Sequence, residues 1–291
     1  MDRYEELAIT FERVAKIAGA GDESGVLRPL AKACGWGARD IGAPLLPSGV
    51  RHGVPYGISF VLGAGAPEVR VFVEPQADPA SLASYREASA RVADFIAAQS
   101  GTDIARLVDV REPFARIWYA VAFRPNAAPA YRAYLCLADR DRESVVARTL
   151  SSLGVVDVVR REPHDMATMI GVDLHASPRL KLYVLRPDYV LDHPFARAMT
   201  GGDAPLGWLS CHFLESPSAR VAWHYSALRH APDDEDLARR LVRFLESERI
   251  ETSVYERMRR EVPFRHHFVT YQRIDDAPRV TVYLLPDVKR P

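Results

Sequence analysis

Strand-like runs of β-branched and aromatic residues occur in pairs along this chain. In each pair, a short connector rich in Gly, Pro, Asn, Asp or Ser separates the two runs, which is the pattern of a β-hairpin. The pattern recurs five times. The paired runs are 53–63 with 69–75, 116–123 with 131–138, 169–174 with 179–187, 207–214 with 220–228, and 265–272 with 279–287.

Amphipathic stretches with apolar residues at helical spacing fill most of the gaps between these pairs. The spacing predicts helices over 3–18, 80–96, 143–153 and 235–247, with weaker signals over 188–200 and 251–260. Asp233 and Asp234 follow Pro232 and are typical of a helix cap and a first turn. No low-complexity linker divides the chain, so we expect one domain over residues 1–291.

These elements predict an α+β fold, a ten-stranded antiparallel barrel built from five hairpins and surrounded by helices. Closure removes the exposed edges of an antiparallel sheet, and helices with one apolar stripe can coat the outside. A barrel of this size encloses a lumen that can hold a small ligand. The alternative is a lumen filled by packed side chains, with the cationic residues of the strands pointing outward.

One face of the second strands carries an aromatic residue in every hairpin. These aromatics are Phe72, Tyr134, Tyr183, Tyr225 and Tyr283, and two positions earlier stand Arg70, Arg132, Lys181, Trp223 and Thr281. Since strand side chains alternate with a period of two, each residue shares a face with the aromatic that follows it. We expect these faces to line the lumen.

The charge of the chain narrows the function classes. Lys and Arg together equal Asp and Glu, 38 against 38, which argues against a nucleic-acid binder that works through bulk positive charge. No apolar stretch approaches the roughly 18–20 residues of a membrane helix, and the acidic N-terminal segment is unlike a signal peptide. The three cysteines lie too far apart for a metal site or a disulfide framework. We therefore expect a cytoplasmic, metal-free protein.

The cationic residues within the strands point to an anion. Lys is scarce in this chain, so Lys181 inside the run RLKLYVL is conspicuous. A cation inside a sheet is costly unless it is paired or binds an anion. Arg offers bidentate hydrogen bonds to phosphate, and the face of a Tyr ring stabilises a neighbouring cation. The pattern indicates a site for a polyanionic group beside a cationic or aromatic group.

Several segments carry a resemblance to a known family. They are PYGIS followed by VRVFVEP, then AYRAYL, then IGVDL with SPRLKLYV, and finally PRVTVYLLP. With them the chain resembles, over nearly its whole length, the aromatic prenyltransferases of the dimethylallyltryptophan synthase type. The resemblance implies the ABBA or PT barrel. It also implies transfer of a dimethylallyl or longer prenyl group from an allylic diphosphate to an aromatic acceptor, such as an indole or tryptophan derivative.

The resemblance also implies a set of site residues. Diphosphate ligands would be Arg70, Arg132, Arg179 and Lys181, and the residues that shield the allylic cation and contact the diphosphate would be Tyr134, Tyr183, Tyr225 and Tyr283. Arg132 replaces the usual Lys and keeps its charge, whereas Trp223 stands where a polar residue is usual. Because several protein cations can replace Mg²⁺, we expect no required cofactor and no metal site, although Mg²⁺ would be compatible.

The acceptor side departs from the family pattern. Indole-prenylating relatives carry a Glu within the segment that matches PYGIS, where it takes the acceptor proton, and Gly57 holds that position here. The catalytic base is therefore unassigned, with Asp173, His212 and Tyr56 as the nearby titratable candidates. The candidate acceptor-pocket residues are Gly57, Trp118 and Trp223.

Two other functions stay open. The acceptor could be an aromatic side chain of a peptide, or the protein could be a non-catalytic barrel that binds a lipid-like or anionic ligand. In each case we expect small molecules or a peptide as partners, and neither nucleic acid nor membrane. The segment APDDEDLARR does not match an Asp-rich magnesium motif, because Leu237 stands where the next Asp is required. The pair His266–His267 lacks partners at metal-ligand spacing.

Overall fold

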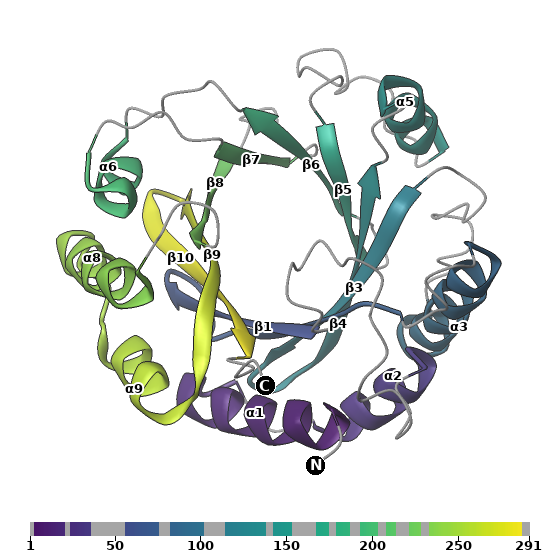
Figure 1. The fold of residues 1–291 in the computed structure, drawn as a ribbon, viewed down its shortest axis with the longest axis horizontal. Helices are drawn as coiled ribbons and strands as arrows, with labels where there is room; N and C mark the ends of the chain where they lie inside the picture. The colour runs from purple at the N-terminus through teal and green to yellow at the C-terminus, as the bar shows by residue number, and fades with distance from the viewer. Residues whose placement is uncertain are drawn as a thin grey trace.

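The strands of this protein form one closed barrel (Figure 1). The computed structural model describes residues 3–20, 24–35, 56–75, 82–101, 114–137, 142–152, 167–174, 179–186, 193–202, 208–213, 221–227 and 233–286. Its strands are β1 (Tyr56–Gly63), β2 (Val69–Val73), β3 (Phe114–Arg124), β4 (Ala127–Leu137), β5 (Ala167–Leu174), β6 (Arg179–Arg186), β7 (Trp208–Phe213), β8 (Val221–Ser226), β9 (Phe264–Ile274) and β10 (Ala277–Pro286).

Each strand pairs antiparallel with its neighbour in sequence, and β1 also pairs with β10, which closes the barrel. Tight turns join β3 to β4 and β9 to β10. Asn126, Asp275 and Asp276 have φ of 55°, 49° and 62° there, the left-handed values that two-residue hairpin turns demand. The connectors of β5–β6 and β7–β8 lie outside the described residues. The prediction of a curled antiparallel sheet with helices around it is confirmed.

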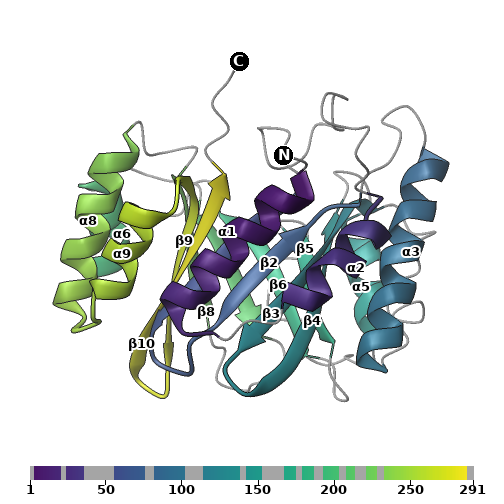
Figure 2. The ribbon, with the colours of Figure 1, turned by 90° about the horizontal axis from the view of Figure 1, so that it is seen from below.

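The helices lie around the outside of the barrel (Figures 1 and 2). They are α1 (Arg3–Ala18), the short 3-10 helix η1 (Ser24–Val26), α2 (Leu27–Ala33), α3 (Leu82–Ser100), α5 (Arg142–Ser152), α6 (Pro194–Thr200), α8 (Asp234–Ser247) and α9 (Ser253–Glu261). Every predicted helical stretch overlaps one of them, whereas η1 and α2 had no clear signal. None of the helices in the described ranges is long and apolar enough to cross a membrane.

The apolar stripes of the helices and the outer faces of the strands form the main hydrophobic core. Phe11 of α1 packs on Phe123 of β3 with ring centroids 4.6 Å apart, and Phe195 of α6 stacks on Tyr271 of β9 at 5.4 Å. A second, smaller cluster lies inside the barrel, where Tyr134 and Tyr183 meet Ala120 and Ala222. Both faces of the sheet are therefore covered, which explains why the strand runs are so rich in apolar residues.

Candidate functional site

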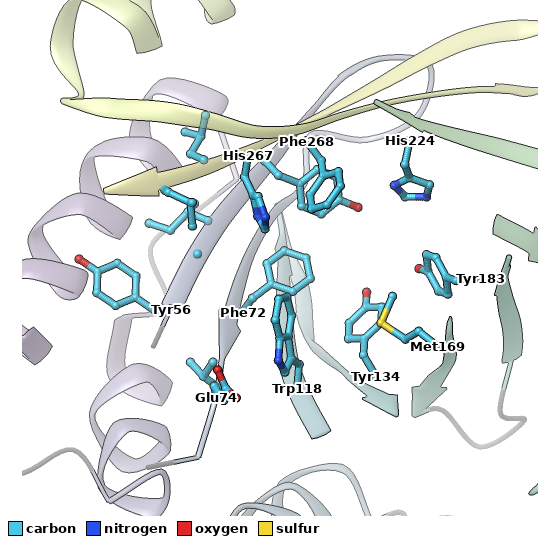
Figure 3. Close-up of a pocket in the computed structure, with 16 residues that line it drawn as sticks. Tyr56, Phe72, Glu74, Trp118, Tyr134, Met169, Tyr183, His224, His267 and Phe268 are labelled. Atoms are coloured by element: carbon cyan, nitrogen blue, oxygen red, sulfur yellow. The ribbon is translucent and has the colours of Figure 1, made fainter. Parts of the chain in front are cut away.

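Five aromatic side chains form a closed ring around the lumen (Figure 3). The members of this aromatic ring come from the second strand of each pair, and they are Phe72, Tyr134, Tyr183, His224 and Tyr283. From Phe72 the centroid distances are 5.8 Å to Tyr134, and then 6.1 Å from Tyr134 to Tyr183. The circuit closes with 5.5 Å from Tyr183 to His224, 6.3 Å from His224 to Tyr283, and 5.4 Å back to Phe72.

On one side of the aromatic ring lie buried cations. Arg70, Arg132 and Lys181 each precede a ring residue by two positions, so they share its face. Arg132 and Lys181 are almost completely buried. Asp173 of β5 is their counter-ion, with its carboxylate 2.7 Å from Lys181 Nζ and 2.9 Å from Arg132 Nε. Burial acts to raise the pKa of Asp173, but Arg132 and Lys181 outweigh it and hold this pKa below its usual value.

A second buried carboxylate, Glu68, holds the guanidinium groups on this side. Glu68 is fully buried and accepts hydrogen bonds from Arg70 and from Arg124, whose Nε is 2.6 Å away. Arg132 Nη1 and Arg279 Nη2 lie 3.6 Å and 3.8 Å from it. Burial acts to raise the pKa of Glu68, but these four arginines, Arg70 first, hold it far below its usual range. Burial and the charge of Arg70 lower the pKa of Arg279 to about 10, which leaves it protonated at neutral pH.

The two carboxylates do not balance these cations. We call this set the basic cluster. Within the described residues it comprises Arg70, Arg124, Arg132, Lys181 and Arg279 with the carboxylates Glu68 and Asp173. Five positive and two negative side chains leave an excess of three positive charges on one side of the aromatic ring. Arg124 is 41% exposed, so the four buried cations exceed the two carboxylates by two charges. A buried excess of this kind is costly unless an anion binds there.

The other side of the aromatic ring opens into an apolar pocket (Figure 3). The space in and in front of the pocket is about 740 Å³, which includes solvent at its open side. Besides the ring residues, its wall includes Tyr56, Gly57, Ile58, Trp118, Met169, Phe268, Leu284 and Leu285, with the polar groups Glu74 and His267. A lumen with this pocket is not the filled core that the alternative interpretation required.

Some polar atoms inside the barrel have no hydrogen-bond partner among the described residues. They include Ser59 Oγ, Trp118 Nε1 and His224 Nε2. In the strand register Ser59 lies between Arg70 of β2 and Tyr283 of β10, at the boundary between the aromatic ring and the basic cluster. Since buried polar groups are normally satisfied, such atoms point to a ligand that carries complementary groups.

The chain was compared with protein families, curated proteins and solved structures. No protein-family model matches the chain, and no curated protein matches it in sequence. Solved structures do match. The 5-dimethylallyltryptophan synthase from Streptomyces coelicolor has a TM-score of 0.85 at 20% identity, over 100% of this chain and 99% of that chain. The prenyltransferase PriB has 0.81 at 20% over 98% and 96%. The 6-dimethylallyltryptophan synthase from Micromonospora olivasterospora, in complex with DMASPP and Trp, has 0.80 at 21% over 98% and 97%.

This chain has the dimethylallyltryptophan synthase fold. The resemblance found in the sequence is confirmed at the level of the fold. The similarity spans both chains almost completely, so the barrel of this protein and that of these synthases correspond from end to end.

Within this fold, two residues lie elsewhere than the sequence predicted. Tyr225 was expected to line the lumen, but its side chain lies in the main hydrophobic core outside the barrel. Burial raises the pKa of Tyr225 to about 12, with Arg240 and Asp236 of α8 as its charged neighbours. Trp223 shares this outward face and packs against the same core, so it does not line the pocket. A one-residue difference in register reverses every side chain of a strand, and His224 therefore completes the aromatic ring.

Other predicted residues fall into three groups. Around the lumen lie the cations Arg70, Arg132 and Lys181 and the tyrosines Tyr134, Tyr183 and Tyr283. The pocket is lined by Gly57, Trp118 and Tyr56. Arg179 and His212 lie in β6 and β7, where their backbones stand opposite Asp173 and Leu182, but their side chains lie outside the described set. Asp173, a candidate base, is the counter-ion of the basic cluster.

The site also contains four residues that the sequence patterns did not single out, namely Glu68, Arg124, Arg279 and His224. Glu68 precedes Arg70 by two positions and Arg279 precedes Thr281 by two, so the same alternation could have placed both in the lumen. Within the described residues, no group of three or more His, Cys, Asp or Glu side chains is placed to hold a metal ion.

Proposed function

We propose that this protein is an aromatic prenyltransferase, which moves a prenyl group from an allylic diphosphate to an aromatic acceptor without a metal ion. The carrying observation is the order of parts along the lumen. A basic cluster with an excess of three positive charges, a closed aromatic ring and an apolar pocket follow one another. Each part suits one section of the reacting pair: the diphosphate, the allylic cation and the acceptor.

The diphosphate binds in the basic cluster. Arg and Lys side chains donate charge-assisted hydrogen bonds to its oxygens, and the excess positive charge neutralises the anion. When the allylic C–O bond ionises, the leaving diphosphate gains negative charge, and the same cations stabilise that charge. Because these groups are held in place by Glu68 and Asp173 before the substrate arrives, little reorganisation is needed during the reaction.

The allylic cation lies within the aromatic ring. The faces of Tyr134, Tyr183 and Tyr283 present their negative quadrupole to it, and the closed circuit of side chains keeps water away. The acceptor occupies the pocket on the other side and attacks the cation from there. The solved relatives include complexes with DMASPP and Trp. On this basis we propose a dimethylallyl-type donor and an indole-type acceptor for this chain as well.

We also propose that residues 1–291 form one domain of five hairpins, with Arg179 joining the diphosphate ligands. Arg179 stands opposite Asp173 in the register of β5 and β6, next to the cations that Asp173 already binds.

The test is release of diphosphate from dimethylallyl and geranyl diphosphate, with and without EDTA. The acceptor panel contains indoles, phenols and short peptides with Trp or Tyr, so that a peptide acceptor would be found. We expect acceptor-dependent release that persists in EDTA. Tight binding of an unreactive thiolodiphosphate without any turnover would favour the non-catalytic barrel instead. Loss of activity in EDTA would contradict the metal-independent mechanism.

Lys181→Gln tests the basic cluster, and Lys32→Gln is its matched control because Lys32 is exposed on α2, outside the barrel. Loss of a charge-assisted hydrogen bond costs about 1.5–3 kcal/mol, so we expect the affinity for inorganic diphosphate to fall roughly ten- to a hundredfold in Lys181→Gln. Titration calorimetry measures the affinity. Equal affinities in the two variants would contradict the assignment of this cluster.

A further inference from the structure

His224 is the member of the aromatic ring that carries basic ring nitrogens. Its imidazole contacts the rings of Tyr183 and Tyr283, with centroids 5.5 Å and 6.3 Å away, and it also lines the apolar pocket (Figure 3). It therefore borders both the place proposed for the allylic cation and the place proposed for the acceptor.

The orientation of this imidazole is held from one side. Nδ1 lies 2.7 Å from Thr270 Oγ1, on the neighbouring strand β9, and this hydrogen bond is buried. Nε2 is also buried, and it has no hydrogen-bond partner among the described residues. In the tautomer whose Nδ1–H donates to Thr270 Oγ1, Nε2 keeps its lone pair inside the lumen.

The surroundings keep His224 uncharged. Burial, together with the nearby charges of Arg70 and Lys181, lowers its pKa to about 3. A neutral imidazole is the form that a base requires, and it does not repel an allylic cation. When a diphosphate anion binds to Arg70 and Lys181, it offsets their effect and makes Nε2 more basic, so the base gains strength as the donor substrate arrives.

We propose that His224 Nε2 is the base that takes the proton from the prenylated acceptor. The proposal rests on the proposed prenyltransferase function and assigns the group that the sequence left open. The allylic C–O bond breaks and its electron pair leaves with the diphosphate. The π electrons of the acceptor ring then form the new C–C bond. The C–H electron pair at that carbon returns to the ring as its proton passes to Nε2, and the imidazolium finally passes the proton to the released diphosphate.

Other titratable groups are less well placed among the described residues. Asp173 lies in the basic cluster, where Arg132 and Lys181 occupy its carboxylate. Glu74 and His267 line the pocket but are not members of the aromatic ring. His224 alone among the described pocket residues combines a place in that ring with a neutral, buried basic nitrogen.

The experiment compares His224→Phe, which keeps an aromatic ring in place, with Tyr225→Phe at the next residue, whose side chain lies outside the barrel. Dimethylallyl diphosphate and the best indole acceptor are the substrates. Diphosphate, prenylated product and dimethylallyl alcohol are each measured over time. A second acceptor carries deuterium at the carbon that becomes prenylated. Binding of dimethylallyl thiolodiphosphate checks that each variant retains its donor site.

Loss of a general base typically lowers a rate by 10²–10⁴-fold. We therefore expect product formation in His224→Phe to fall about a hundredfold, with much smaller loss of diphosphate release, so that most of the prenyl group appears as the alcohol. A primary deuterium isotope effect should appear in this variant, and Tyr225→Phe should behave as wild type. In His224→Ala, added imidazole should restore part of the product yield.

Three results would overturn the assignment. The first is a His224→Phe enzyme whose ratio of product to diphosphate and isotope effect equal those of wild type, which would make His224 a wall residue. The second is a selective loss of thiolodiphosphate affinity, which would make it a donor ligand. The third, no diphosphate release from the wild-type protein with any acceptor, would reject the proposed function itself and is thereby distinguishable from the other two.

Discussion

Single residues decide the character of the lumen. Gly171 of β5 lies between two ring tyrosines, and a Cβ atom there would come within 3.1 Å of the Tyr183 ring and 3.5 Å of the Tyr134 ring. Glycine at this position therefore allows the aromatic ring to close. On β8, the choice between His224 and its neighbour Tyr225 decides whether the ring contains an imidazole.

The lowered pKa of His224 predicts how the folding stability of the protein depends on pH. The folded protein holds the pKa of His224 at about 3, chiefly through burial, against the ordinary histidine value of 6.5. Below pH 6.5 the unfolded chain binds a proton at this residue while the folded protein does not, so folding stability falls as the pH decreases. The slope from this group is about 1.4 kcal/mol per pH unit, and it continues until the folded pKa is reached.

His224→Phe should therefore flatten the decline of stability between pH 6.5 and about 3. Above pH 6.5 the pH dependence of the variant should parallel that of wild type, because the residue is neutral in both states there. Urea unfolding at a series of pH values measures the difference between the two proteins, and other groups cancel in it. Parallel curves down to pH 4 would show that His224 titrates normally in the fold.

At the scale of elements, hydrogen bonds link the first turn of α8 to strand β9 and, through β9, to helix α9. Asp233 caps the helix by accepting a hydrogen bond from the Glu235 backbone N–H at 2.9 Å, as the sequence predicted. Asp234 does more than contribute first-turn charge. Its carboxylate accepts from the backbone N–H of His266 on β9 at 3.0 Å and lies 2.9 Å from Nδ1 of the same residue. Tyr255 of α9 contacts the other ring nitrogen, Nε2, at 2.9 Å.

Asp234→Ala should accordingly cost about 1–3 kcal/mol of unfolding free energy, because it leaves a buried His266 without its acceptor. Asp236→Ala is the control from the same turn. Its ion pairs with Arg239 and Arg240 lie at the surface, and their loss should cost less than about 1 kcal/mol. Chemical denaturation of both variants measures the difference, and equal losses would contradict a structural role for the Asp234–His266–Tyr255 connection.

At the scale of the whole molecule, the basic cluster exists because the barrel is closed. Its members come from β3, β4, β5, β6 and β10, with Arg70 on β2 and Glu68 just before that strand. The pairing of β1 with β10 brings the first and last of these strands to the same wall. Binding of an anion at the cluster should therefore be linked to the stability of the entire barrel.

Inorganic diphosphate should raise the melting temperature of the protein. At a concentration a hundredfold above the dissociation constant, one site contributes about 2.7 kcal/mol, and differential scanning calorimetry detects this. Sulfate at matched ionic strength controls for general salt effects and should produce a much smaller rise. Equal shifts with the two anions, or no shift with either, would contradict a built diphosphate site.

The sequence alone predicted the strands, most of the helices and several lumen residues. Alternation with a period of two marked which residues of a strand share a face, and the repeated hairpins placed Arg70, Arg132 and Lys181 on equivalent faces, each two residues before a ring aromatic. Helical spacing located the outer layer. These properties are local, since they depend on neighbours a few positions apart, and for that reason they can be read without the fold.

Only the tertiary structure decided which residue of β8 faces the lumen and which charged groups pair with one another. The aromatic at position 225 invited the wrong alignment of the fourth hairpin, and the pairing of β8 with β7 and β9 settled that His224 faces inward. The partners of each charge were equally out of reach. Glu68 meets Arg124, Arg132 and Arg279 across several strands. Such contacts depend on register and on closure of the barrel, which bring together residues that are far apart in sequence, and no local pattern encodes those distances.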